Sequence, residues 1–145
     1  MLLRFLLLVG VVACSSDDKD AARHFCQNTR ATFLEIIETR FHAIEQTVVP
    51  PNCGRIRSGA EFARGAYMGF RAAAAPFRFR PEVQRVYTVL DGESARHNML
   101  DELASLECID DSELTPDRMA DLRKTVASLR ARGTAAVAAC TKSDD

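Results

Sequence analysis

Apolar residues recur at helical spacing along almost the whole chain, and this periodicity constrains the fold more than any other feature. The clearest stripe occupies the last third and advances by alternating steps of three and four residues: Met119, Leu122, Val126, Leu129, Gly133, Ala136 and Cys140. Such steps place all seven residues on one helical face and form a heptad seam. Because other helices must cover a seam of this kind, the sequence predicts an all-α fold.

Three further segments have the same periodicity and are separated by prolines and polar residues. They cover residues 20–48, 58–75 and 81–106, and the fourth helix starts at the N-cap Thr115 followed by Pro116. Gly92 lies inside the third segment, where we expect it to kink or break the helix, since glycine is unfavourable in a helix interior. The second segment contains Gly65, Gly69 and Ala73 at four-residue steps, which predicts close approach of a neighbouring helix at this face.

Short connections between four helices favour an antiparallel up-down four-helix bundle. The chain has 145 residues, which suits one domain with a single core. We place the bundle at residues 23–141 and a polar tail at 142–145. The formal net charge is -1, so the overall charge balance gives no reason to expect a nucleic-acid partner.

The first 13 residues are apolar apart from Arg4 and end in Val11-Val12-Ala13-Cys14. The apolar run is too short to span a bilayer but has the length of a signal-peptide core. The four terminal residues resemble the lipobox of bacterial lipoproteins. This resemblance implies cleavage before Cys14, attachment of a diacylglyceryl group to its sulfur, and N-acylation in most cases. Residues 14–22 are then the lipidated cysteine and a polar tether.

Two consequences of the resemblance concern where the chain resides. It implies a protein exported and lipid-anchored to the cell envelope, and Ser15 rather than Asp after the cysteine points to the outer membrane more than the inner one. One alternative is ordinary secretion, with the same cut after Ala13 and an unmodified Cys14. Another is that the segment is a buried N-terminal helix of the domain.

The chain has five cysteines, and assigning Cys14 to lipid leaves four. In an oxidising compartment an even number suggests two disulfides, whereas a zinc site made of such scattered cysteines is the poorer alternative. An up-down bundle brings cysteines to one end or the other, and a disulfide needs Cα atoms within about 7 Å. The topology therefore predicts Cys26–Cys140 at one end and Cys53–Cys108 at the other.

Candidates for chemistry are few. Glu93 and His97 stand one helical turn apart and are weak candidates for a metal or haem site inside a bundle, although di-metal bundles repeat Glu-x-x-His on two helices and this chain does not. Ser94 lacks the surrounding glycines of a hydrolase nucleophile. We therefore expect no enzyme activity, no resident metal and no cofactor, with a small ligand-binding bundle as the alternative function.

Charge is distributed unevenly along the chain. Residues 53–85 contain seven arginines against two glutamates, and residues 91–121 contain ten acids against two arginines. We expect the two segments to compensate each other inside the bundle. The alternative is a dipolar surface that recruits a charged partner.

The most distinctive segment is Pro76-Phe77-Arg78-Phe79-Arg80-Pro81, in which two aromatic residues alternate with two arginines. One interpretation is that one or both phenylalanines cap the end of the core while the arginines are solvated. The other is that all four side chains contact the membrane surface or an envelope protein. The sequence thus predicts a non-catalytic, membrane-anchored lipoprotein whose helical domain binds a protein partner or the membrane surface.

Overall fold

The computed structural model describes residues 14–46, 51–92 and 98–142, and these residues are helical with no strand among them. The elements in chain order are α1 (Cys14–Arg30), the π-helix η1 (Ala31–Ile36), α2 (Ile37–Gln46), α3 (Cys53–Ala74), the 3-10 turn η2 (Ala75–Phe77), α4 (Pro81–Asp91), α5 (Met99–Ala104), the 3-10 turn η4 (Asp111–Glu113) and α6 (Pro116–Cys140). Within the described part of the chain, none of these helices is long and apolar enough to cross a bilayer.

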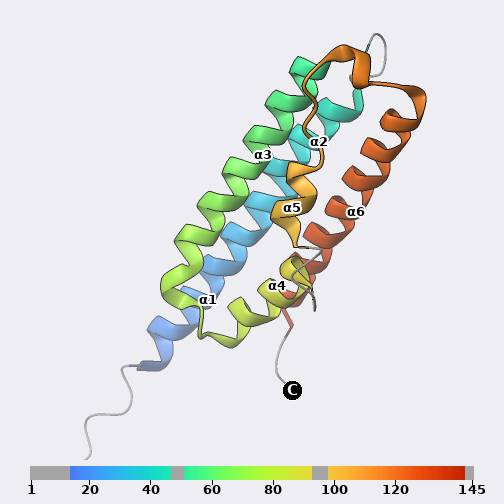
Figure 1. Cartoon of the computed structure of the whole chain (residues 1–145). Helices are drawn as coiled ribbons and strands as arrows, with labels where there is room; N and C mark the ends of the chain where they lie inside the picture. Colours follow the sequence, from blue (N-terminus) through green and yellow to red (C-terminus); the bar gives the residue numbers. More distant parts are fainter. Residues whose placement is uncertain (1–13, 47–50, 93–97, 143–145) are drawn as a thin grey trace, which may run out of the picture.

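The helices form an elongated helical bundle (Figure 1). The continuous run α1–η1–α2 lies beside α3 and α6, and these three make up most of its length. The shorter helices α4 and α5 complete the bundle, with α4 near the end where α1 begins and α5 between α3 and α6. The main contacts join α2 to α3 and α4 to α6.

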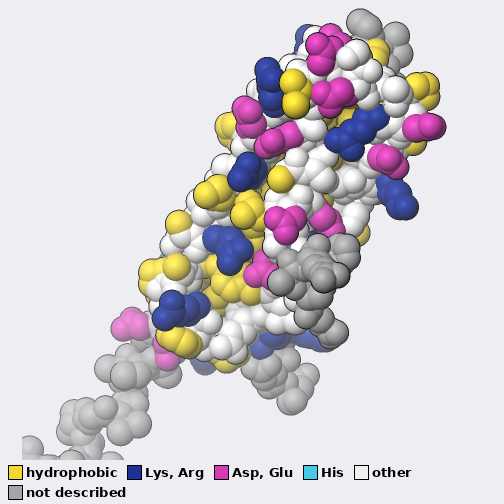
Figure 2. All heavy atoms as spheres, in the orientation of Figure 1, with side chains coloured by type: hydrophobic (Ala, Val, Ile, Leu, Met, Phe, Trp, Pro, Cys, Tyr) yellow, Lys and Arg dark blue, Asp and Glu magenta, His cyan; other side chains and the backbone are white. Residues whose placement is uncertain are grey.

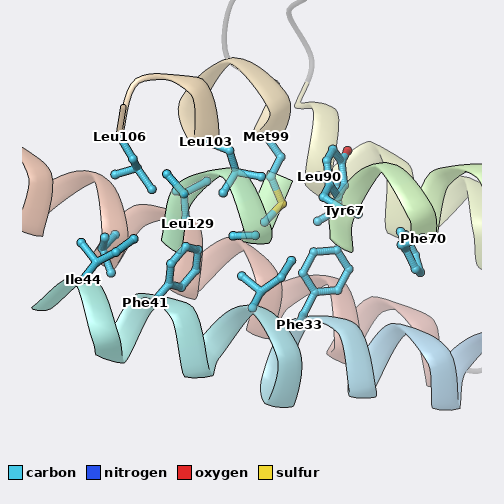
Figure 3. Packing of buried hydrophobic residues seen from close by; sticks show 14 of the residues in the cluster. Phe33, Phe41, Ile44, Tyr67, Phe70, Leu90, Met99, Leu103, Leu106 and Leu129 are labelled. Atoms are coloured by element: carbon cyan, nitrogen blue, oxygen red, sulfur yellow. The ribbon is translucent and has the colours of Figure 1, made fainter. Parts of the chain in front are cut away.

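The core is aliphatic and aromatic, and residues from every α-helix contribute to it. Figure 3 shows Phe33 and Phe41 pointing from the first helical run toward Tyr67 of α3 and Leu129 of α6. The α6 face predicted from the heptad seam is the buried face, since all seven residues of the predicted stripe are buried. Gly133 lets α6 approach closely, because an added Cβ would lie 3.2 Å from the Cβ of Phe33.

The second helix begins at Cys53, five residues earlier than the sequence predicts. The side chain of Asn52 accepts a hydrogen bond from the backbone N–H of Arg55 at 3.0 Å and so caps the helix. The prolines before Asn52 predict a stop for the first helix. Asn52 is also the N-cap that starts the next helix, a signal that the predicted start at residue 58 does not use.

The third predicted helix is divided into two, α4 and α5. α4 ends at Asp91, and Gly92 follows with a φ of 67°, a left-handed conformation that glycine adopts without a steric penalty. A new cap then starts α5, in which the side chain of Asn98 accepts a hydrogen bond from the Asp101 N–H at 2.8 Å. The break predicted near Gly92 is therefore present.

Residues 14–22, expected as a polar tether, form the first turns of α1. Asp17 lies in the first turn, where a negative charge favours helix formation, and Ala21 and Ala22 have high helix propensity. The chain therefore enters the bundle as a helix that starts at Cys14.

The face of α3 with small residues does not receive a neighbouring helix, and this prediction is wrong for the described chain. Gly65, Gly69 and Ala73 are exposed, and a Cβ added at either glycine would have no atom within 4 Å. The close approach occurs one helical face away, where a Cβ at Gly59 would lie 3.0 Å from Ile44 of α2.

Two disulfides close the bundle, and both pairings agree with those predicted from the topology. Cys26 of α1 is bonded to Cys140 at the end of α6, with Cα atoms 5.6 Å apart. Cys53 at the start of α3 is bonded to Cys108, with Cα atoms 5.7 Å apart. Each bond therefore joins elements that meet at one end of the bundle.

Candidate functional site

The segment from Pro76 to Pro81 connects α3 to α4 at the end of the bundle where α1 begins (Figure 1). Arg80 fixes the segment there, because its guanidinium forms an ion pair with Asp18 of α1 at 3.3 Å. The same guanidinium donates to the backbone carbonyl oxygen of Asp18 and to the carboxylate of Glu82. The Arg80 side chain is only 23% exposed, so its charge is used within the chain.

The two phenylalanines of this segment are on the surface. Phe77 is 45% exposed and Phe79 is 75% exposed, so the interpretation that they cap the core is wrong. The reason is that Phe25 and Phe70 already close the core at this end, with ring centroids 5.7 Å apart. Ala74 fills the remaining position on α3.

Arg78 lies outside this ion-paired group. Its guanidinium carbon lies 4.7 Å from the centroid of the exposed Phe79 ring, which is a cation–π arrangement. The segment therefore presents two apolar rings and one stacked cation to its surroundings. Figure 2 shows hydrophobic and basic side chains meeting at this end of the molecule.

Sequence reasoning placed Phe77, Arg78, Phe79 and Arg80 in one contact site, and the structure divides this set. Arg80 positions the segment instead of facing outward, and its partners Asp18 and Glu82 were not identified from the sequence. Glu82 could have been found, since an acid two residues after an arginine at a helix start is a local pattern. Asp18 lies 62 positions from Arg80, so no local sequence pattern could identify it as a partner.

The opposite end of the bundle is acidic. Asp110 and Glu113 form a capping box around η4, and Asp111 accepts a hydrogen bond from the backbone N–H of Cys53 at 2.6 Å. A hydrogen bond donated by the backbone N–H of Ser112 lowers the pKa of the Asp110 carboxyl. These acids serve mainly to order the loop. Ile109 within it is 85% exposed.

Charge compensation between the basic and the acidic segments is present in part. Arg64 pairs with Glu107 at 3.4 Å, and Arg71 pairs with Asp91 at 3.7 Å. Both pairs link α3 to the acidic segment, as the expectation of internal compensation requires.

The weak metal candidates, Glu93 and His97, lie outside the described residues, as does Ser94. Within residues 14–46, 51–92 and 98–142, no group of three or more histidine, cysteine or acidic side chains has a geometry that could hold a metal ion.

The comparisons with known proteins give no relative. No protein-family model matches the chain, and no curated protein or solved structure does.

Proposed function

We propose that this chain is an exported bacterial lipoprotein, anchored to the cell envelope through lipid on Cys14, with a small non-catalytic helical domain that acts by binding. The signal-like residues 1–13 and the sequence Val11-Val12-Ala13-Cys14 support the anchor. Ser15 supports the outer membrane as the destination. The binding target of the domain is a protein partner or the membrane surface.

The observation that carries the proposal is the pairing of the cysteines. The chain has five, and four of them pair with each other in two disulfides. The cysteine left over is Cys14, which is the residue that the lipobox assigns to lipid. Disulfides also suit an oxidising compartment outside the cytoplasm.

The domain is suited to binding rather than to chemistry. We assign it to the up-down four-helix class, with α4 and α5 together taking the place of the third helix. Its two disulfides and continuous core make a rigid support for surface residues. Of these, Phe77, Arg78 and Phe79 at the α1 end and Ile109 at the other end are the candidates for contact.

The test is metabolic labelling with a radioactive or clickable fatty acid in a bacterial host, followed by membrane fractionation. The wild-type chain should take up label and float with membranes, and Cys14→Ser should do neither. Cys53→Ser is the matched control, since it also removes one thiol but leaves the lipobox intact, and it should still be labelled. Absence of label on the wild type would refute the anchor.

A further inference from the structure

We propose that the α1 end of the domain lies on the membrane that holds Cys14, with Phe77 and Phe79 inserted at the interface and Arg78 against anionic phospholipid head groups. This inference rests on the proposed lipid anchor and adds the binding target and the orientation of the domain. It names a lipid surface, in preference to an envelope protein, as the occupant of this site.

The first argument is the short distance between the anchor and the segment. α1 is continuous from Cys14. Asp18 lies four residues after Cys14, which is about 6 Å along the helix axis at the rise of an α-helix. Arg80 is bonded to Asp18. The head-group layer of one leaflet is about 5–7 Å thick. A lipid on Cys14 therefore brings the connected segment to the level of the head groups.

The second argument is the exposure of the two rings. Phe79 is 75% exposed and Phe77 is 45% exposed, whereas Phe25 and Phe70 at the same end are buried. Exposed aromatic rings are favourable at a membrane interface, where they leave water without crossing the bilayer. Burying one such ring should strengthen binding about tenfold.

The third argument concerns charge. Four acids lie near this end on α1 and α4: Asp17, Asp18, Asp20 and Glu82. Arg80 pairs with Asp18 and Glu82, and Arg23 lies 3.6 Å from Asp20, so two guanidinium charges offset two of the four negative charges within the chain. Arg78 stacks on Phe79 and adds one positive charge beside the ring. One basic residue near an anionic surface strengthens binding about fivefold.

Arg80 is thus a positioning residue for this contact. It holds the segment against α1 and offsets one of the two negative charges of Asp18 and Glu82, which would otherwise repel anionic lipid. The positioning role differs from direct binding of anionic lipid in how it depends on lipid charge. If Arg80 acts by position, its removal should weaken ring insertion with and without anionic lipid, whereas direct binding makes the loss appear only where anionic lipid is present.

The chain contains no tryptophan, so one introduced at Phe79 is a unique fluorescent reporter. The experiment uses the lipidated full-length mature protein in vesicles of phosphatidylcholine and phosphatidylglycerol with brominated acyl chains. Phe79→Trp should show blue-shifted emission that the bromine quenches. Ile109→Trp, 85% exposed at the opposite end, is the matched control and should show neither effect.

Positioning is tested in the Phe79→Trp background. Arg80→Gln should reduce quenching with and without phosphatidylglycerol, because it removes the contacts to Asp18 and Glu82, and Arg78→Gln should reduce it only where phosphatidylglycerol is present. A helical circular dichroism spectrum and intact disulfides identify the variants that are folded. If Arg80→Gln lowers quenching only where phosphatidylglycerol is present, as Arg78→Gln does, Arg80 binds lipid directly and the positioning role is wrong.

The outcomes separate this inference from the proposed function. If the protein takes up no acyl label and does not float with vesicles, the anchor itself is refuted. If it floats but the Phe79→Trp reporter is quenched no more than the Ile109→Trp reporter, the anchor stands and the membrane contact is refuted. The exposed rings then become a surface for an envelope protein.

Discussion

Arg130 of α6 is the centre of the ionic contact between α6 and the first helical run. Its Nε donates to both carboxylate oxygens of Glu38, at 2.8 and 3.0 Å. Its two terminal nitrogens each donate to an oxygen of Glu45 at 2.9 Å. The substitution Arg130→Met keeps an unbranched apolar stem but removes all four hydrogen bonds, and it leaves two carboxylates without their shared cation.

The cost of this substitution follows from the exposure of the three side chains. Hydrogen bonds to charged groups contribute about 1.5–3 kcal/mol when buried, whereas fully exposed ion pairs contribute about 0.2–1 kcal/mol. The side chains of Arg130, Glu38 and Glu45 are 34%, 36% and 31% exposed, so solvent screens them in part. With two carboxylates held by one guanidinium, we expect Arg130→Met to lower the free energy of unfolding by about 2 kcal/mol at pH 7.

The same contact should make stability depend on pH. The hydrogen bond from Arg130 lowers the pKa of the Glu45 carboxyl below its ordinary value. A lowered carboxyl pKa contributes stability above the unfolded-state pKa, near 4.3, and that stability is lost as pH falls through the lower folded-state pKa. The difference between wild type and Arg130→Met should therefore shrink between pH 5 and pH 3.

The assay is urea unfolding followed by far-ultraviolet circular dichroism, with the disulfides intact, at pH 7 and pH 3. Arg57→Met is the control, because Arg57 is exposed on α3 and its loss should change the free energy of unfolding by no more than about 0.5 kcal/mol. An Arg130→Met variant within that margin of wild type at pH 7 would show that solvent screening cancels the contact. A difference that is equal at the two pH values would show that Arg130 stabilises by packing alone.

Two other predictions use the same unfolding assay. Serine at both positions of either disulfide should lower the free energy of unfolding by about 4 kcal/mol, because the two loops are nested and the remaining disulfide shortens the loop that the removed one closed. A loss below about 1 kcal/mol for either variant would argue against stabilisation by loop closure. Gly69→Ala should raise the free energy of unfolding by about 0.5–1 kcal/mol, since the added methyl group enters open space on a helix. Gly133→Ala should raise it less, because its Cβ would lie 3.2 Å from Phe33. An equal increase for the two variants would mean that the contact with Phe33 relaxes freely.

The helices and the disulfide pairs could be predicted because they depend on local periodicity and on chain direction. The stripe from Met119 to Cys140 gave the buried face of α6, because each residue of a heptad seam faces the same way whatever covers it. The pairings followed from which ends of the helices meet, and they required no knowledge of side-chain packing.

The errors come from packing between distant segments. Small residues at four-residue steps on α3 could serve either a close helix contact or an open surface, and only the position of α2 decides that Gly59 makes the contact and Gly69 does not. In the same way, Phe79 could have capped the core, but Phe25 and Phe70 from two other helices already occupy that place. Periodicity within one helix contains no information on either choice.

The two disulfides also determine how the chain would transmit a mechanical load. A pull between the start of α1 and the acidic loop after Cys108 has two covalent routes, one through each disulfide. Each route contains about 40 residues, so the fully stretched chain could extend to only about 140 Å. Because the routes are nearly equal in length, both would become taut together and share the tension. The domain could lose every helix under load and still link its two ends over a short, fixed span.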